Sequence, residues 1–124
     1  VVLCSWITGN NDMHLKDCSL LEPHDGNIRL TPAYDMLNAV ILNPKDDEEL
    51  ALTLNGKKKK LKRSDFITSG LTMGVEQKTI ERLIGKYVKL LPDMKKLIGN
   101  SFLNDELKDK YTELITERID RIVE

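Results

Sequence analysis

A polar stretch near the start of the chain holds the residues best suited to chemistry. Residues 9–17 read GNNDMHLKD, and within them Asp12 and Asp17 lie five positions apart. A loop that transfers a phosphoryl group needs a carboxylate to accept the hydroxyl proton, and a second oxygen ligand a few residues on to hold Mg²⁺. A third carboxylate, Asp35, lies 23 positions beyond Asp12. The spacing of these three carboxylates favours phosphoryl-transfer chemistry.

Each of these side chains also has a structural interpretation. Asp is common in loops, where it caps turns, so an Asp pair at this spacing is weak evidence by itself, and Asp35 could equally cap a turn. His14 is one of two histidines in the chain and is more typical of a packed or hydrogen-bonded side chain than of a zinc ligand. Lys16 could neutralise a transferring phosphate or lie in solvent. None of the seven glycines has a phosphate-loop spacing, so a nucleotide-clamping loop is expected elsewhere.

The polar stretch is expected to lie between a helix and a hairpin. Residues 1–8 are apolar almost all round, which predicts the end of a buried helix that stops at Gly9. Short apolar runs at 18–21 and 27–30 flank Asp25-Gly26, which favours a tight β-hairpin. Functional loops commonly occupy such a position.

The middle of the chain is expected to be irregular. Residues 31–49 lack a sustained period and predict an ordered loop with one short helix near 34–40. A second strand pair, 51–55 with 60–62, is predicted around Asn55-Gly56. The four lysines at 57–60 indicate a solvated turn, because no aromatic residue is interleaved for base stacking.

The remainder is expected to be helical. Apolar residues from Ile80 to Leu91 recur at the helical period and predict one buried face, with Pro92 ending the helix and a further short helix holding Met94, Leu97 and Ile98. A shorter helix is predicted from Ser64 or Asp65 to about Met73. Asn104, followed by two acidic residues, predicts the start of a long terminal helix.

Composition limits the class of protein. The chain has 124 residues and a net charge of −1, which fits a single domain and makes direct contact with nucleic acid unlikely on electrostatic grounds. The longest apolar run is far shorter than a bilayer span and does not resemble a signal peptide. The sequence therefore predicts a mainly α, α+β domain in the cytoplasm. Because the chain opens with Val in an apolar segment, it is expected to be one piece of a longer protein.

Two separated motifs resemble a known family. The string GNNDMHLKD with the following CSLL, then the predicted hairpin, then LTPAYDML are similar to the catalytic and metal-binding segments of the HipA-like serine/threonine kinases of bacterial toxin-antitoxin modules. That family has approximately G-N-x-D-x-H-x-K-N followed by P-x-Y-D. The later NGKKKKLKRSDF and SFLNDELKDKY also resemble its C-terminal region, so the resemblance covers nearly the whole chain.

The resemblance implies a role for each candidate residue. Asp12 is expected to be the catalytic base, with His14 and Lys16 supporting the loop and the phosphates. Asp35 is expected to bind the metal. Asp17 occupies the position of the family's Mg²⁺-binding Asn and is expected to act as the second metal ligand, through a hard oxygen but with an added negative charge.

These roles imply a kinase-like C-terminal lobe, residues 1–124, without its N-terminal lobe. The expected reaction transfers the γ-phosphoryl group of ATP, with Mg²⁺, to a Ser or Thr of a protein, and the resemblance implies a target in the translation apparatus. An antitoxin is the expected regulatory partner, and the chain alone is expected to be inactive. The alternatives are a pseudokinase-like binding module, which Asp17 motivates, and a helical domain that binds nucleic acid through residues 57–63.

Overall fold

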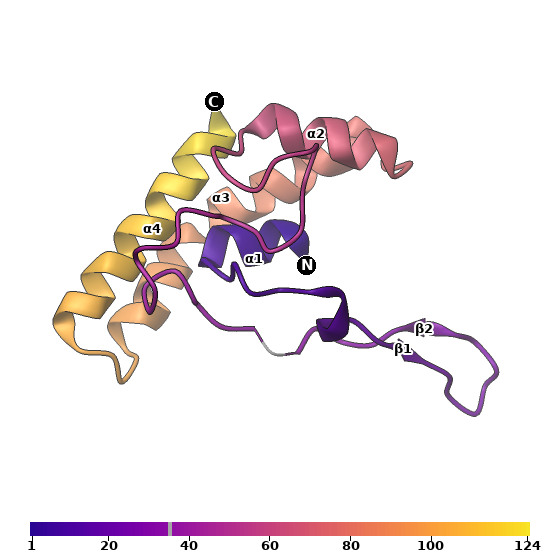
Figure 1. The fold of residues 1–124 in the computed structure, drawn as a ribbon, viewed down its shortest axis with the longest axis horizontal. Helices are drawn as coiled ribbons and strands as arrows, with labels where there is room; N and C mark the ends of the chain where they lie inside the picture. Colours follow the sequence, from indigo (N-terminus) through magenta and orange to yellow (C-terminus); the bar gives the residue numbers. More distant parts are fainter. Residues whose placement is uncertain (35) are drawn as a thin grey trace.

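The computed structural model describes residues 1–34 and 36–124, and within them it shows four α-helices and one two-stranded sheet (Figure 1). This architecture confirms the mainly α, α+β class. In chain order the elements are α1 (Val2–Thr8), the 3₁₀ turn η1 (Leu15–Asp17), β1 (Leu20–Leu21), β2 (Arg29–Leu30), α2 (Arg63–Thr72), α3 (Gln77–Gly99) and α4 (Asp105–Val123). No helix in the described part of the chain is both long enough and apolar enough to cross a bilayer.

The core forms where the first and last helices meet. Trp6 and Ile7 of α1 are fully buried, as are Ile115 and Ile122 of α4. The ring of Trp6 also packs against Phe66 of α2, with 4.9 Å between ring centroids. Figure 1 shows α1 lying beside α4, with the β1–β2 hairpin projecting away from the helices, while α3 packs against both α2 and α4. The hydrophobic core therefore holds α1 firmly, and the polar loop starts from its C-terminal end.

The predicted helix ends and caps are largely confirmed. α1 ends at Gly9, which has a φ of 76°, the left-handed conformation that favours glycine at this position. Asn104 caps α4, because its side chain accepts a hydrogen bond from the Leu107 backbone N–H at 2.8 Å. The observed α2 also agrees with its predicted bounds to within two residues.

The prediction that Pro92 ends a helix is wrong. α3 continues from Gln77 through Pro92 to Gly99 and includes the segment expected to form a separate short helix. Pro92 is exposed, and the last turn beyond it buries Ile98 in the core. Packing on α4 thus compensates for the hydrogen bond that proline cannot make. Leu83 and Val88, expected on the buried face, are 46% and 39% exposed.

The loop between β2 and α2 is more irregular than predicted. No helix forms at residue 34 or at 36–40, because the backbone N–H groups of Ala39 and Val40 both donate to the carbonyl oxygen of Gly9, at 3.0 and 3.1 Å. The second strand pair is reduced to one bridge, between Leu54 and Lys57. The reason is that the N–H groups of the second expected strand donate to the side chain of Glu49 instead. The first hairpin forms as predicted, with Leu20 opposite Leu30.

Candidate functional site

The loop that carries the candidate residues is fixed at its start. The carbonyl oxygen of Ser5 accepts a hydrogen bond from the Asn10 N–H at 2.8 Å, and the carbonyl of Trp6 accepts one from Gly9 at 3.3 Å. These bonds close the end of α1 and turn the chain sharply away from the helix. A Cβ atom at Gly9 would lie 2.6 Å from Asn38 Oδ1 and 2.6 Å from Leu114 Cδ2, so the backbone here is tightly enclosed.

A second set of bonds ties the loop to the segment after the hairpin. Asn11 Nδ2 donates to the carbonyl oxygen of Glu48 at 3.0 Å. Asn10 is 1% exposed, and its Oδ1 accepts the Asp12 backbone N–H at 3.3 Å. This contact spans two residues and is a local turn of the kind that Asn side chains form. The buried Asn10 therefore fixes the backbone conformation at Asp12.

Asp12 presents its carboxylate to solvent at this turn. Its side chain is 63% exposed, and its Oδ1 lies 3.6 Å from Nε2 of His14, whose side chain is 47% exposed. A carboxylate in such a position can accept a proton from a hydroxyl group brought to it, and the imidazole limits the rotamers that it adopts. The structure thus brings together two of the predicted site residues.

Asp17 takes part in the fold of the loop. Its Oδ2 accepts the His14 backbone N–H at 2.9 Å, which caps the η1 turn, and its side chain is partly buried. Lys16 is exposed, and its carbonyl oxygen accepts a hydrogen bond from the Tyr34 hydroxyl at 3.1 Å. That hydroxyl also lies 2.6 Å from Ser19 Oγ. Tyr34 therefore fastens the end of the loop, a role that the sequence analysis missed although the residue lies within the quoted LTPAYDML motif.

The site can be tested for a fit to Mg²⁺. The predicted ligand Asp35 lies outside the described residues, and among the described ones no three His, Cys, Asp or Glu side chains gather closely enough to hold a metal ion. Hard carboxylate oxygen is the donor that Mg²⁺ prefers, and Asp17 uses only Oδ2 in its bond to His14. Among the described residues Asp17 therefore offers one carboxylate oxygen of the type that Mg²⁺ prefers, and the metal site with Asp35 stays a prediction.

A buried ionic network lies behind the loop. Glu49 is 8% exposed, and its carboxylate accepts hydrogen bonds from Trp6 Nε1 at 2.7 Å, Arg121 Nη1 at 2.6 Å, and the backbone N–H groups of Lys60 and Leu61. Burial alone would raise the pKa of Glu49, but the bonds from Trp6 and Arg121 and the positive charge of Arg118 hold it below its usual value. The carboxylate is therefore ionised at neutral pH.

Two arginines complete the network. The guanidinium of Arg118 lies 5.0 Å from the Trp6 ring centroid, and that of Arg121 lies 5.5 Å from it. Arg118 Nη1 also donates to the carbonyl oxygen of Trp6 at 2.8 Å. The sequence analysis missed these partners, because contacts across more than 40 residues leave no local signal. The acidic cluster at 46–49 was the only hint of Glu49.

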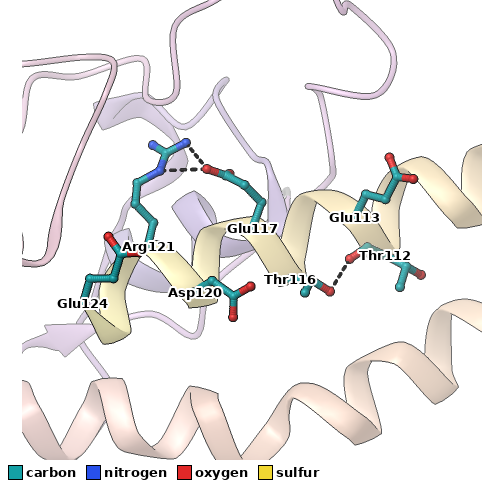
Figure 2. A pocket seen from close by; sticks show the side chains of 7 residues that line it. All are labelled: Thr112, Glu113, Thr116, Glu117, Asp120, Arg121 and Glu124. Atoms are coloured by element: carbon teal, nitrogen blue, oxygen red, sulfur yellow. Dashed lines mark hydrogen bonds and ion pairs between the residues drawn. The ribbon is translucent and has the colours of Figure 1, made fainter.

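A separate surface hollow of about 600 Å³ runs along α4. Figure 2 shows the side chains that line it, which come from α4 and from Glu124 directly after it, with Arg121 directed toward Glu117. The lining residues are Thr112, Glu113, Thr116, Glu117, Asp120, Arg121 and Glu124. None of the predicted site residues contributes to it, so the candidate site is the exposed loop and not this hollow.

Comparisons with known proteins identify the family and the fold. Residues 1–94 match the family described as the HipA-like C-terminal domain, and the chain belongs to this family. The fold resembles a solved structure of HipA with HipB and operator DNA, from a toxin-antitoxin system of Shewanella oneidensis MR-1, with a TM-score of 0.80 and 17% sequence identity. No curated protein sequence matches the chain.

The extent of the structural match is informative. It covers 98% of this chain, including α4, which lies beyond the part matched by the family, and 30% of the HipA chain. At this identity the match defines the fold. The HipA structure contains operator DNA, so it gives no support to the expectation that this chain avoids nucleic acid.

Proposed function

We propose that the chain is the C-terminal lobe of a HipA-like serine/threonine protein kinase of a toxin-antitoxin module. The observation that carries the proposal is the presentation of Asp12. Its carboxylate is 63% exposed, yet the loop beneath it is held by the buried Asn10 and by the bonds of Gly9 and Asn11 to residues 39, 40 and 48. A rigidly held but accessible carboxylate suits a general base.

In this proposal the residues of the loop have distinct tasks. Asp12 orients the acceptor hydroxyl and receives its proton, while His14 fixes the carboxylate and Lys16 faces the phosphate charge. ATP is the phosphoryl donor, and Mg²⁺, held by Asp17 and Asp35, would neutralise charge on its phosphates. The residues that clamp the nucleotide lie outside this chain, which spans 30% of the HipA chain that it resembles.

The proposed setting follows from the same family. An antitoxin similar to HipB is the proposed regulatory partner, and a protein of the translation apparatus is the proposed substrate. The absence of an apolar spanning helix from the described residues is compatible with action in the cytoplasm. Contact with nucleic acid stays open to experiment, since the net charge of −1 argues against it while the HipA structure contains operator DNA.

A second candidate function is a pseudokinase-like module that binds the antitoxin without catalysis. The observation that favours it is the use of the Asp17 carboxylate in a bond to the His14 backbone. A carboxylate that caps η1 also brings a second negative charge into the loop, which disfavours nucleotide binding. The two candidates predict different outcomes for phosphoryl transfer.

The test compares Asp12→Ala with Asp25→Ala in the full-length protein. Asp25 is a suitable control because it lies in the hairpin turn, is exposed, and pairs with Arg29 on the surface. Transfer of labelled phosphate from ATP to protein Ser or Thr should fall by about 10²–10⁴-fold in Asp12→Ala, with ATP binding nearly unchanged and Asp25→Ala fully active. Retained transfer in Asp12→Ala contradicts the kinase assignment. Absence of transfer by the unmodified full-length protein favours the binding module, and the 124-residue chain alone is expected to be inactive.

A further inference from the structure

Two buried donors at the end of α1 have thioether sulfur as their partner. Ser5 is 0% exposed, and its Oγ lies 3.2 Å from Met13 Sδ and 3.9 Å from Met36 Sδ. Asn10 is 1% exposed, and its Nδ2 lies 3.9 Å from the same Met36 sulfur. Within residues 1–34 and 36–124, neither donor has an oxygen acceptor. Both donors therefore converge on Met36.

Thioether sulfur is a weak acceptor, so these donors recover little of the hydrogen bonding that they lose on burial. Buried hydroxyl and amide groups are usually satisfied by oxygen. An oxygen placed on Met36 Sδ would face two N–H or O–H groups that are already in position. A sulfoxide oxygen to the side of the two lines from Met36 Sδ to its donors, each 3.9 Å long, can come within a normal hydrogen-bond distance, about 2.8 Å, of Ser5 Oγ and Asn10 Nδ2.

We propose that Met36 is a site of reversible oxidation to the sulfoxide by a hydroperoxide. Met36 is 39% exposed, which gives the oxidant access from solvent. Met13 is partly buried, and its sulfur lies beside only one of the two donors, Ser5 Oγ at 3.2 Å. The sulfoxide oxygen of Met36 accepts hydrogen bonds from Ser5 Oγ and Asn10 Nδ2, and this stabilises the oxidised form in the folded protein.

The chemical step is a two-electron oxygen transfer. A lone pair of Met36 Sδ attacks one oxygen of hydrogen peroxide, the S–O bond forms as the O–O bond breaks, and the displaced hydroxide leaves as water after taking up the second peroxide proton. The sulfur loses two electrons and the peroxide gains them. A methionine sulfoxide reductase reverses the change at the expense of a dithiol.

The modification would act on the candidate loop. Asn10 holds the Asp12 backbone, and Met36 belongs to the segment that follows Asp35 in the sequence. New hydrogen bonds from Asn10 and Ser5 to the sulfoxide join this segment to the start of the loop. Oxidation by peroxide therefore restricts the motion of residue 36 relative to α1 and the loop. This effect does not depend on whether the protein transfers phosphate.

The test treats the full-length protein with hydrogen peroxide and follows each methionine by peptide mass. We expect Met36 to gain one oxygen severalfold faster than Met13. Met73, which is 68% exposed, serves as the reference for exposure alone. A Met36 that stays unmodified when Met73 is fully oxidised overturns the proposal.

A second measurement tests the role of the donors. Ser5→Ala should lower the melting temperature of the oxidised protein by at least about 3 °C more than that of the reduced protein, because only the sulfoxide gains a strong bond from Ser5. The double variant Ser5→Ala with Met36→Leu should lose this difference. An equal effect of Ser5→Ala on the oxidised and reduced proteins contradicts the proposed hydrogen bonds.

Discussion

Arg121 Nη1 donates to Glu49 Oε1 over 2.6 Å and so joins α4 to the loop before α2 across 72 positions of the chain. The same carboxylate accepts a hydrogen bond from Nε1 of Trp6 in α1. Three segments distant in sequence therefore share one buried charge. The packing of α4, the loop before α2 and α1, from which the candidate loop starts, therefore all depend on Glu49.

Glu49→Ala is expected to destabilise the domain strongly. The change leaves the Trp6 indole N–H and two backbone N–H groups without their acceptor and removes the buried one of the two carboxylates paired with Arg121, and the loss of one partner from a buried ion pair costs about 3–5 kcal/mol. Urea unfolding measures the effect. The matched control is Glu48→Ala, whose exposed side chain lies 3.7 Å from Lys58 Nζ and should contribute about 0–1 kcal/mol. Equal losses from the two variants would show that the network does not stabilise the fold.

Stability should fall in acid in a defined pH range. Burial alone would raise the pKa values of Glu49 and Asp65, but their hydrogen bonds and neighbouring positive charges hold both below the ordinary values of 4.5 and 3.8. Because the unfolded chain binds protons more readily, the free energy of unfolding is greatest above these values and declines as pH falls through and below them. Melting temperature followed downward from neutral pH should show this decline, and Glu49→Gln should make it shallower. An unchanged slope would contradict the assignment to Glu49.

Gly9→Ala should disturb the candidate loop as well as stability. Gly9 has a φ of 76°, and an added Cβ would lie 2.6 Å from Asn38 Oδ1. Gly74 is a matched control, since its φ of 83° imposes the same backbone strain while nothing lies within 4 Å of its Cβ position. Both alanine variants should lose about 1–2 kcal/mol to strain, and Gly9→Ala should lose more because of the clash. Thermal unfolding measures the loss of stability in each variant, and equal losses would contradict the inference that the backbone at Gly9 is tightly enclosed.

Asp17→Asn separates the two proposed functions. The change keeps an oxygen for the metal and removes one negative charge, so a working kinase should hold or raise its ATP affinity and keep its activity. A binding module should stay inactive after the same change. The measurement is phosphate transfer by the full-length protein at saturating Mg²⁺. A large loss of activity in Asp17→Asn would contradict both readings and indicate that the second carboxylate itself is required.

Local chemistry allowed much of the fold to be predicted. The end of α1 at Gly9 and the start of α4 at Asn104 depend on short-range caps, and the structure confirms both. Pro92 shows the limit of a local rule, because the burial of Ile98 on the far side of it favours a continuous helix. The path of the loop between β2 and α2 could not be predicted, since several of its N–H groups pair with the Gly9 carbonyl and the Glu49 side chain, in addition to the bonds within the loop.

The candidate site, like the fold, was predictable where it depends on local sequence and not where it depends on distant contacts. The polar run at 9–17 identified Asp12 and His14, and the structure places them 3.6 Å apart. The residues that support this run were missed. Ser5 and Asn10 act through burial, and Tyr34 through a bond that spans 18 positions to Lys16. A sequence motif shows which groups can react, but the contacts that hold them depend on distant packing.

The hydrogen bond from Arg118 to the Trp6 carbonyl limits how early the domain can fold while the ribosome makes it. It spans 112 positions, and at about 5–20 residues per second the ribosome needs roughly 6–22 s to add them. During that interval Trp6 and Ile7 lack the part of their native cover that α4 supplies. The core cannot close until the residues of α4 have emerged, whichever segments precede or follow them. The nascent chain therefore keeps one face of α1 without its native partner until the last helix of the domain has been made.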